Sequence, residues 1–476
     1  MTPLTPQQKA LRINLDRSVY GTLAEIGAGQ EVARWFFQAG GAARTVAKTI
    51  SAYDMAVSDA IYGESERYVS RQRVSGMMAY EYNLLVERLS AKRGDQTAFF
   101  AYADTVATRS YSRSIDNSSA DGNGWLGIRF QATPHAEPSD IIIHIITRDK
   151  ERVREQEAIG ILGVNLIHGA AFLRREPVEL LISLMDNLTR DRVEMDMVQF
   201  SGPAFAEVDN RLMSLQLVEH GFTDAAMFTA KGRVVQPAEA LYKKPILVER
   251  GRFRPITLLT LDLLERSREQ FFAEPELEGE EPVVLMEMTL RGLRSEGGLL
   301  SEEGVDQKEF LARADTLRAL GLSVLISNHG PYYQLVENLS RYTQKNIGIA
   351  LGIPALGHVL DEKHYHGLSG GGLEAIGRLF KQHVRMYLYP YLDPNTNQLV
   401  TAETLEVAPR WRHLYAFLRE NRYVEPVRNC TRKYLSIDGD EVLRQIQAGE
   451  PAWENAVPPE IAGIIKQERL FGWKEH

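Results

Sequence analysis

The chain has 476 residues, a length that suits two or three separately cored domains. Hydrophobic residues make up 44% of it and charged residues 25%, which is typical of a globular protein and excludes a largely disordered one. Lys and Arg number 55 against 63 Asp and Glu, so the formal net charge of −8 predicts neither a nucleic-acid partner nor an anionic membrane surface as a partner. The only cysteine, Cys430, excludes an intramolecular disulfide and a multi-thiolate zinc site, and it favours a reducing, cytoplasmic location.

The N-terminal stretch and the apolar runs give no sign of export. Residues 1–16 contain no apolar stretch after a basic one, and nowhere do about 18 consecutive apolar residues occur. We therefore expect no signal peptide, no membrane span and a cytoplasmic protein.

Residues 1–95 form the first predicted segment, which we expect to be helical. From residue 19 to residue 89 the apolar residues fall largely at helical spacing, and glycines break the pattern into shorter helices. The segment EIGAGQ, residues 25–30, is similar to the acid-x-Gly-x-Gly turn of dinucleotide-binding domains, but the third glycine of that fingerprint is absent. No convincing buried strand precedes it, so helix-breaking glycines are the favoured interpretation.

Residues 96–275 are predicted to form an α/β domain. Strands are expected at 99–106, 125–131 and 141–147, the last two as a hairpin, and helices then alternate with further apolar runs. Such alternation favours βαβ units on a largely parallel sheet.

A second α/β domain with a mixed C-terminal tail is expected over residues 281–476. The acidic, Pro- and Gly-containing stretch 273–281 is expected to be the linker before it. Beyond this linker, strands are predicted at 283–288, 323–327, 347–351 and 385–389, with helices at 307–320, 332–343 and from residue 372. The overall prediction is an α/β fold in which a helical N-terminal region precedes largely parallel or mixed sheets flanked by helices.

The segment DEKHYHGLSGGG, residues 361–372, is the most suggestive place for a ligand. A glycine run that opens a helix presents free N–H groups and a positive dipole to a phosphate. We assign Lys363, Ser369, Gly370 and Gly371 to phosphate binding, and His366 to proton transfer. The alternative is that the glycines make a tight turn and that Ser369 or Gly370 caps the helix, because the spacing is not that of a P-loop.

The same segment raises the question of a metal ion. His364 and His366 stand two residues apart, and with Asp361 or Glu362 they offer donors that suit zinc or iron. Two histidines are a weak signal, and surface histidines on a loop are the favoured interpretation, so no metal site is predicted.

Two further places carry polar side chains near predicted strand ends. His329 follows the strand at 323–327 and is assigned as a general acid or base. Arg252 and Arg254 belong to the densest basic cluster and are assigned to neutralising a phosphate or another anion, with a solvated loop as the equal alternative.

Several segments spread over nearly the whole chain carry a resemblance. They are RSVYGTLAEIGAGQEVARWFF, FFAYADTVATR, GWLGIRFQ, FSGPAFAEVDNRLMSLQLVEHG, GRFRPIT, SGGGLEAIGRLF and YLYPYLDP. Together they resemble a family of bacterial cytoplasmic proteins of similar length, which carry the automatic labels nicotinate-nucleotide adenylyltransferase or TonB-dependent receptor.

Neither label is supported by the residues. GRFRPIT, residues 251–257, looks like the GxFxPxHxGH phosphate-binding turn that the first label implies, but its histidines are absent and Thr257 stands where the first should be. A receptor of the second kind needs a signal peptide and many short alternating strands, and the helical periodicity predicts otherwise. The resemblance by itself implies no activity.

The sequence thus predicts a cytoplasmic α/β protein that binds a phosphorylated or nucleotide-like small molecule, with a transferase as the candidate enzyme class. It contains no complete catalytic constellation, so the alternative is a non-catalytic scaffold that self-assembles through residues 1–95. A metal-dependent hydrolase that uses His364 and His366 is a third candidate. We expect a homo-oligomer without a nucleic-acid or membrane partner, and the sequence identifies no cofactor.

Overall fold

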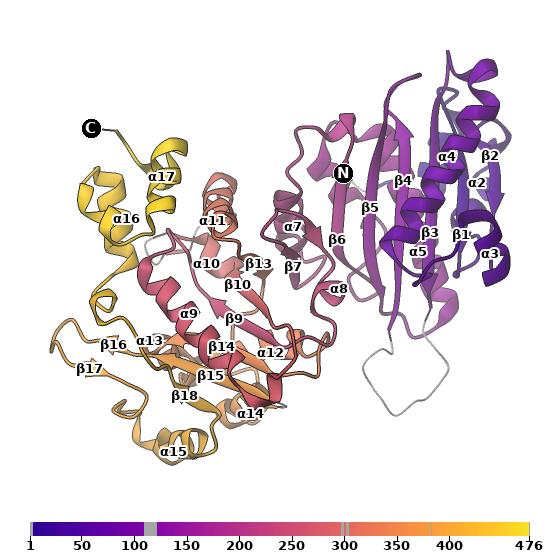
Figure 1. Cartoon of the computed structure of the whole chain (residues 1–476). Helices are drawn as coiled ribbons and strands as arrows, with labels where there is room; N and C mark the ends of the chain where they lie inside the picture. The colour runs from indigo at the N-terminus through magenta and orange to yellow at the C-terminus, as the bar shows by residue number, and fades with distance from the viewer. Residues whose placement is uncertain (1–2, 109–120, 297–298, 301–303, 382, 476) are drawn as a thin grey trace. The chain divides into compact units, whose positions relative to one another are not determined.

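The computed structural model describes residues 3–108, 121–296, 299–300, 304–381 and 383–475 (Figure 1). The chain separates into two compact units, Met1–Asp224 and Ala225–His476. Each unit has its own main sheet with helices packed against it, so the predicted α/β class with mixed sheets flanked by helices is confirmed.

The division into units differs from the predicted segments. Residues 1–95 hold the expected helices but also two strands of the first unit's sheet, so they do not form a separate helical region. The acidic stretch 273–281 lies inside the second unit, between α9 (Leu258–Phe272) and β10 (Val283–Thr289). Its Glu274 is only 5% exposed and pairs with Arg385, so the stretch is an anchored connection within a βαβ unit rather than a linker.

The first unit is built on a six-stranded mixed sheet of order β2-β1-β3-β4-β5-β6. Strand β1 is parallel to β2 and β3, whereas β3 to β6 follow one another antiparallel. The strands are β1 (Val19–Ile26), β2 (Val46–Ile50), β3 (Ala98–Ala107), β4 (Gly122–Gln131), β5 (Pro138–Thr147) and β6 (Val193–Ser201). The chain leaves β1 for β2 on one side and returns to β3 on the other, so its winding direction reverses at β1.

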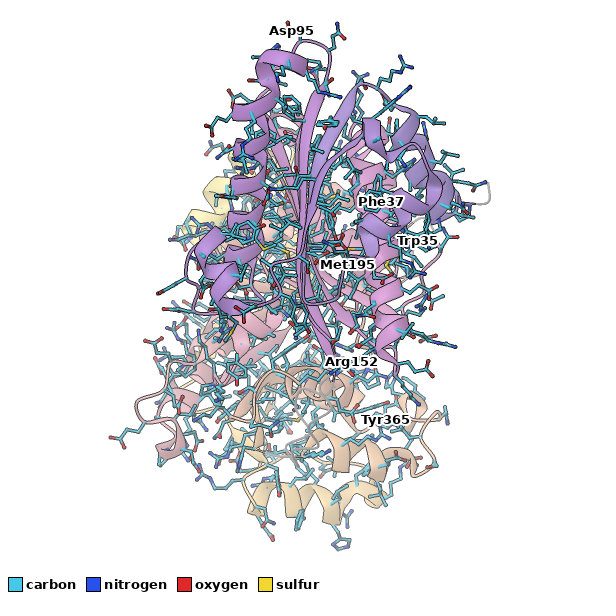
Figure 2. All side chains as sticks on the ribbon, turned by 90° about the vertical axis from the view of Figure 1, so that its right-hand side faces the viewer. Trp35, Phe37, Asp95, Arg152, Met195 and Tyr365 are labelled. Atoms are coloured by element: carbon cyan, nitrogen blue, oxygen red, sulfur yellow. The ribbon has the colours of Figure 1, made fainter. Side chains whose placement is uncertain are left out.

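Helices cover both faces of this sheet. On β3, Phe99 and Ala101 pack with α4, whereas Phe100 and Tyr102 belong to the core shared with α1, α2 and α5. These helices are α1 (Pro6–Leu15), α2 (Glu31–Ala39), α4 (Arg71–Arg93) and α5 (Arg152–Phe172). Figure 2 shows Trp35 and Phe37 of α2 on one side of the strands and Asp95, which follows α4, on the other. Strands covered on both faces carry continuous apolar runs instead of alternating ones.

The second unit contains an eight-stranded sheet of order β18-β15-β14-β9-β10-β13-β7-β8. The six strands from β18 to β13 are parallel, and β7 and β8 continue the sheet antiparallel. Besides β10 they are β7 (Ala225–Phe228), β8 (Val234–Val235), β9 (Ile246–Arg250), β13 (Ser323–Ser327), β14 (Ile347–Gly352), β15 (Val384–Tyr389) and β18 (Val424–Pro426). The strands predicted at 283–288, 323–327, 347–351 and 385–389 are confirmed to within one residue.

The order of these strands places a topological switch point in the middle of the sheet. From β9 the chain moves outward through β10 and β13, and then returns to β14 on the other side of β9 before it continues to β15 and β18. In open α/β sheets the carboxyl ends of the two strands at such a reversal flank the usual ligand crevice.

Two helical layers cover the sheet of the second unit. One core face joins the strands to α12, α13, α14 and α15, and the opposite face carries α9 and α11. Their bounds are α11 (Gln307–Ala319), α12 (Tyr332–Leu339), α13 (Ile353–Val359), α14 (Gly371–Leu379) and α15 (Arg412–Glu420). The chain ends with α16 (Gly439–Ala448) and α17 (Pro459–Glu468). Within the described parts of the chain, no helix combines the length and the apolar composition needed to cross a membrane.

Candidate functional site

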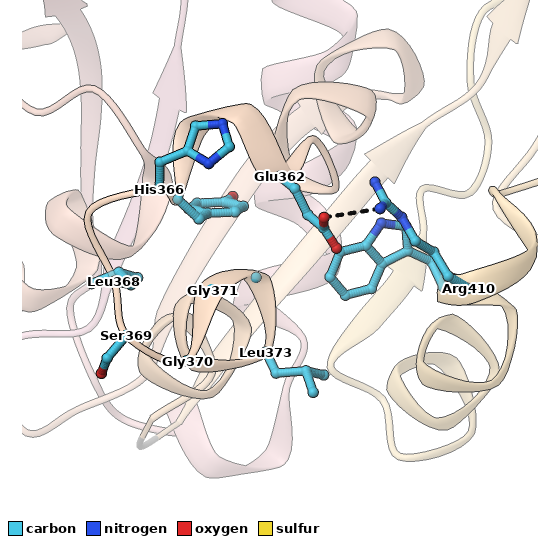
Figure 3. Close-up of a pocket in the computed structure, with 11 residues that line it drawn as sticks. Glu362, His366, Leu368, Ser369, Gly370, Gly371, Leu373 and Arg410 are labelled. Carbon is cyan, nitrogen blue, oxygen red and sulfur yellow. Dashed lines mark hydrogen bonds and ion pairs between the residues drawn. The ribbon is translucent and has the colours of Figure 1, made fainter.

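The glycine-rich turn before α14 lines a pocket of about 480 Å³ in the second unit (Figure 3). Its walls come from the loop before α14, the first turn of that helix and the turn Pro409–Trp411 just before α15. The lining residues are Glu362, Tyr365, His366, Leu368, Ser369, Gly370, Gly371, Gly372, Leu373, Arg410 and Trp411. Four predicted site residues, His366, Ser369, Gly370 and Gly371, therefore meet in one place. The predicted Lys363 is not part of the lining, and its ammonium lies 2.6 Å from a carboxylate oxygen of Asp361.

The first N–H group of the glycine turn is bound by a carboxylate of the chain itself. Gly370 donates its N–H to Glu374 Oε2 at 2.8 Å, and the Ser369 hydroxyl donates to the same oxygen at 3.4 Å. Arg378 donates to the other oxygen at 2.7 Å. The hydrogen bond from Gly370, followed by the interactions with Arg378, lowers the pKa of Glu374. An acidic side chain thus already stands where an anion would cap this helix.

The N–H of Gly371, the first residue of α14, donates to the carbonyl of Leu368 at 3.1 Å, and the second and third N–H groups of the helix are not used. Those of Gly372 and Leu373 make no hydrogen bond to any residue in the described ranges. A helix N-terminus with free N–H groups and the positive end of its dipole favours a negative charge. The turn therefore keeps part of its capacity for an anion although Glu374 occupies Gly370.

Arg410 and Trp411 bring a cation and an aromatic wall to the same pocket. The Arg410 guanidinium lies 2.9 Å from Glu362, and both side chains are largely open to solvent, at 59% and 45% exposure. Trp411 is only 5% exposed and packs so closely on Gly372 that a Cβ there would lie 2.6 Å from the indole. The indole Nε1–H has no hydrogen-bond partner among the described residues.

The predicted Arg252 and Arg254 lie on another turn, after β9. Arg252 donates to both carboxylate oxygens of Asp440 at 2.6 and 2.7 Å, and Arg254 pairs with Glu309. Arg313 binds the same Glu309 at 3.0 Å. Neither of the predicted arginines lines the pocket at α14, so the two assigned groups of phosphate-binding residues are not brought together.

His329 follows β13, as predicted, but it lies among groups that bind one another. Its backbone N–H lies 3.4 Å from Ser327 Oγ, which in turn donates to Glu287 at 2.5 Å. Arg250 forms two hydrogen bonds with the same carboxylate, at 2.7 and 2.9 Å. His329 is 8% exposed and does not line the pocket that contains His366.

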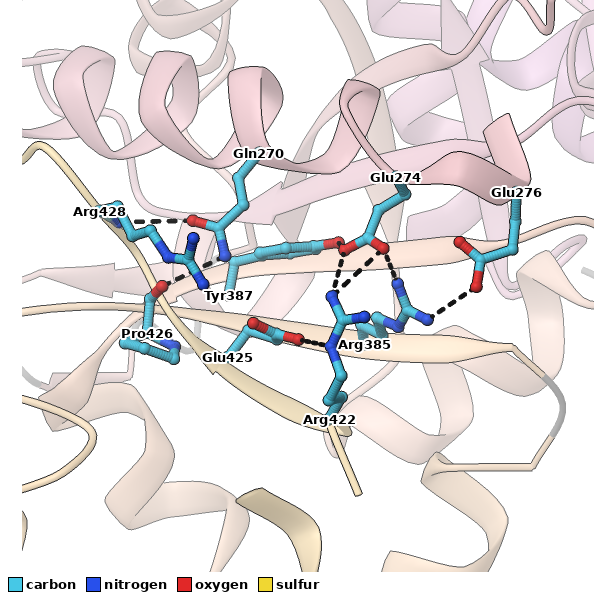
Figure 4. Close-up of polar contacts among 9 residues, drawn as sticks. All are labelled: Gln270, Glu274, Glu276, Arg385, Tyr387, Arg422, Glu425, Pro426 and Arg428. Atoms are coloured by element: carbon cyan, nitrogen blue, oxygen red, sulfur yellow. Dashed lines mark hydrogen bonds and ion pairs between the residues drawn. The ribbon is translucent and has the colours of Figure 1, made fainter. Parts of the chain in front are cut away.

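A dense ionic network at the amino end of β15 has a structural explanation (Figure 4). Buried Glu274 accepts hydrogen bonds from Arg385, from the Tyr387 hydroxyl at 3.3 Å and from Arg422 at 3.4 Å. Glu276 adds a second carboxylate to Arg385 at 3.1 Å. The network fixes the end of α9 to β15 and to Arg422, which precedes β18.

The first unit contains a strand-to-helix turn that the sequence interpretation missed. Segment 25–30 does follow a strand, β1, and leads directly into α2, so the preference for helix-breaking glycines was wrong at this turn. Gly27 has φ +104°, and a Cβ there would lie 1.8 Å from the carbonyl oxygen of Val106. The acid-x-Gly-x-Gly pattern was the signal in the sequence that could have identified this strand-to-helix turn.

Two acids lie side by side beneath that turn. Glu25 pairs in register with Asp104 of β3, and both are 1% exposed. Glu25 accepts hydrogen bonds from the N–H groups of Val32 and Ala33 at 2.8 and 3.0 Å, while Asp104 accepts from the Tyr102 hydroxyl at 2.9 Å. Burial raises the pKa of Glu25 to about 7, and burial together with the charge of Glu25 raises the pKa of Asp104 well above its usual range. The buried carboxylate of Glu25 thus caps the first turn of α2.

Groups that could hold a metal ion do not cluster in the described parts of the chain. Among the described residues there is no cluster of three or more His, Cys, Asp or Glu side chains arranged to hold a metal ion. His364 and His366 belong to the loop beside the α14 pocket, and of the two only His366 lines it.

Comparisons with known proteins do not place the chain in a family. No protein-family model matches the sequence, and no curated protein matches it. Solved structures show a weak likeness to parts of it. A competence/damage-inducible protein from Agrobacterium tumefaciens is 16% identical with a TM-score of 0.26, over 36% of this chain and 98% of that one. A CinA superfamily protein from Enterobacter cloacae is 14% identical with a TM-score of 0.26, over 36% and 95%.

A nucleotide enzyme also occurs among these structures. The nicotinic acid mononucleotide adenylyltransferase of Plasmodium falciparum is 10% identical with a TM-score of 0.32, over 48% of this chain and 98% of that one. Similarity at this level assigns neither a family nor an activity to the chain.

Proposed function

We propose that the second unit binds a phosphorylated or nucleotide-like small molecule in the pocket at α14, with its phosphate at the N-terminus of that helix. The observation that carries this proposal is the convergence of the glycine turn, two free N–H groups and Arg410 on one concavity. The volume of 480 Å³ falls within the roughly 300–1,000 Å³ typical of small-molecule sites.

Each part of the pocket has a role in this binding mode. The N–H groups of Gly372 and Leu373 and the helix dipole attract the phosphate. Arg410 adds a charge-assisted hydrogen bond, because its exposed pair with Glu362 is weak enough to be exchanged. The indole of Trp411 and the side chains of Leu368 and Leu373 offer apolar surface to the rest of the ligand.

Glu374 sets a condition on the ligand. Its carboxylate already occupies the Gly370 N–H, so an incoming phosphate either displaces it or binds beside a negative charge. Two consequences follow: the parent chain binds weakly, and a neutral side chain at this position strengthens the binding.

The test starts from the ligand itself. Native mass spectrometry of the protein purified from its own host identifies co-purifying molecules, and calorimetry then measures their affinity. We expect Arg410→Gln to weaken binding about tenfold or more, the scale of one hydrogen bond to a charged group. Arg412→Gln, two residues away and exposed, serves as the matched control and should leave the affinity unchanged.

Glu374→Gln should have the opposite effect and raise the affinity for the phosphorylated ligand several-fold. The substitution removes the negative charge that repels the phosphate, while it keeps an acceptor for the Gly370 N–H. Equal affinities in the parent, Arg410→Gln and Glu374→Gln chains would remove the pocket from consideration. The absence of any phosphorylated ligand that binds in the millimolar range would do the same.

Transfer chemistry, if it accompanies this binding, involves His366 in our proposal. It is the histidine that lines the pocket, so it is within reach of a bound substrate as a general acid or base. His366→Asn should then lower turnover more than affinity, whereas His329→Asn should change neither. A turnover that is insensitive to His366 contradicts the assignment.

A second candidate function is self-assembly through the first unit. The edge strand β2 is half-exposed along its length, and three large apolar side chains follow it in the open: Tyr53, Met55 and Val57, at 73%, 62% and 51% exposure. Met55→Lys with Val57→Lys should lower the mass measured by light scattering if this surface joins copies of the chain. Deletion of residues 1–95 is unsuitable as a test, because it removes β1 and β2 from the sheet.

A further inference from the structure

The turn after β9 gathers more positive than negative charge. In the part of the chain that the structure describes, the guanidinium groups of Arg252, Arg254 and Arg313 share two carboxylates, those of Asp440 and Glu309. Burial lowers the pKa of Arg313, whose side chain is 1% exposed, and the charges of Arg254 and Arg252 act in the same direction. Among the described residues, these three guanidinium groups are therefore paired with one carboxylate fewer than their number.

The turn is also held in one conformation. Arg313 Nη1 donates to the backbone carbonyl of Arg252 at 3.2 Å and to that of Gly292 at 3.4 Å, and the side chain of Phe253 is buried. The Arg252 guanidinium is 42% exposed, and it reaches away from this fixed base to Asp440. A preorganised guanidinium at a strand end is suited to recognising an oxyanion.

The C-terminal segment places its own acceptors at this edge of the sheet. Asp440, in the first turn of α16, binds Arg252 through both carboxylate oxygens from 188 residues away. The carbonyl of Ala456 accepts the N–H of Leu258, the first residue of α9, at 2.8 Å. Both contacts lie beyond the carboxyl end of β9, one of the two strands at which the winding direction reverses. Ligands of α/β sheets ordinarily bind near such strand ends.

We propose that Asp440 acts as a gate: its carboxylate occupies Arg252 as an intramolecular anion, and an external oxyanion binds Arg252 when Asp440 moves away. Asp440 is 69% exposed, and an ion pair between such exposed groups stabilises little because water screens it. A phosphate or pyrophosphate carries more charge than one carboxylate and competes for the same guanidinium. The inference concerns a turn separate from the α14 pocket and does not depend on a ligand there.

Calorimetry of the full chain with inorganic pyrophosphate at low ionic strength tests this gate. Asp440→Asn should bind pyrophosphate about tenfold more tightly than the parent chain. Glu441→Gln is the matched control, because it removes the same charge one residue further along α16, where the partner is Arg444. It should bind like the parent. Adding Arg252→Gln to Asp440→Asn should abolish the gain.

Three outcomes overturn the inference. One is equal binding by Asp440→Asn and the parent, with circular dichroism and the melting temperature showing that both are folded. Another is a gain that persists when Arg252 is also replaced. The third is a gain that disappears with Arg410→Gln, since the pyrophosphate would then occupy the α14 pocket; that result supports the proposed function while it refutes the gate.

Discussion

At the scale of single residues, the chain repeatedly uses its own carboxylates where an anion would bind. Glu25 caps α2, Glu374 binds the glycine turn of α14, and Asp440 binds Arg252. Their burial separates them: Glu25 is 1% exposed, whereas Asp440 is 69% exposed. A buried acid whose hydrogen bonds are internal is part of the fold, and an exposed one can be displaced by a ligand.

The pair of Glu25 and Asp104 predicts a stability that falls as the pH rises. The folded pKa of Glu25, about 7, lies above its ordinary value of 4.5, so the folded state keeps a proton that the unfolded state releases. Stability should therefore decrease from about pH 4.5 to pH 7, by at most ~3.4 kcal/mol for this group at 1.36 kcal/mol per pKa unit. Denaturant unfolding of the chain at a series of pH values measures the slope.

Asp104→Asn should flatten this dependence, because it removes both a buried titrating acid and its charge next to Glu25. Asp95→Asn, at an exposed carboxylate, should keep the slope of the parent chain. Parallel curves for the parent and Asp104→Asn would show that the two acids are not coupled.

Glu274 and Glu276 form a second matched pair of residues (Figure 4). Glu274 is buried and binds three side chains, whereas Glu276 is 50% exposed and binds Arg385. We expect Glu274→Gln to lower the free energy of unfolding by about 2–3 kcal/mol, because the buried groups around it lose a charged acceptor. Glu276→Gln should cost less than about 1 kcal/mol, as exposed pairs do. Equal losses in urea titrations would contradict this structural role for Glu274.

At the scale of elements, the turn between β1 and α2 depends on one glycine far more than on its neighbour. Gly27 has φ +104° and no room for a Cβ beside the Val106 carbonyl, whereas Gly29 has φ +90° with only Gln156 nearby, at 3.9 Å. Gly27→Ala combines backbone strain with a clash and should cost about 3 kcal/mol or more. Gly29→Ala should cost about 1 kcal/mol, for strain alone. Thermal unfolding compares the two variants, and similar losses would contradict the close approach at Gly27.

Elements were predictable where their signal is local. In the second unit, β10, β13, β14 and β15 are short apolar runs separated by helices, so their sequence pattern gave them to within one residue. In the first unit, β1 and β2 are eight and five residues long, and they lie among helical segments whose periodicity hides their pattern. Pairing across the sheet is what makes them strands: β1 pairs with β3, about 80 residues further on, and β2 pairs with β1.

At the scale of the whole molecule, the division at residue 224 predicts two independently folding fragments. Each unit has a hydrophobic core of its own, the property that defines a domain. Fragments 3–224 and 225–475 should each unfold in one cooperative transition, and the second should bind the ligand of the full chain. Fragment 96–275, which the sequence pattern alone would select, lacks β1 and β2 and should not fold. Cooperative unfolding of 96–275, or its absence in the two units, would reject this division.

The sequence by itself determined the α/β class, four of the six parallel strands of the second unit and the glycine turn that lines the α14 pocket. Each of these rests on residues within a few positions of one another, where periodicity and turn chemistry act. Only the tertiary structure brought Arg410 and Trp411 to that turn, Asp440 to Arg252 and Asp104 to Glu25. These partners lie tens to hundreds of residues apart, and they meet because the strand order and the packing of helices bring them together, which no local pattern encodes.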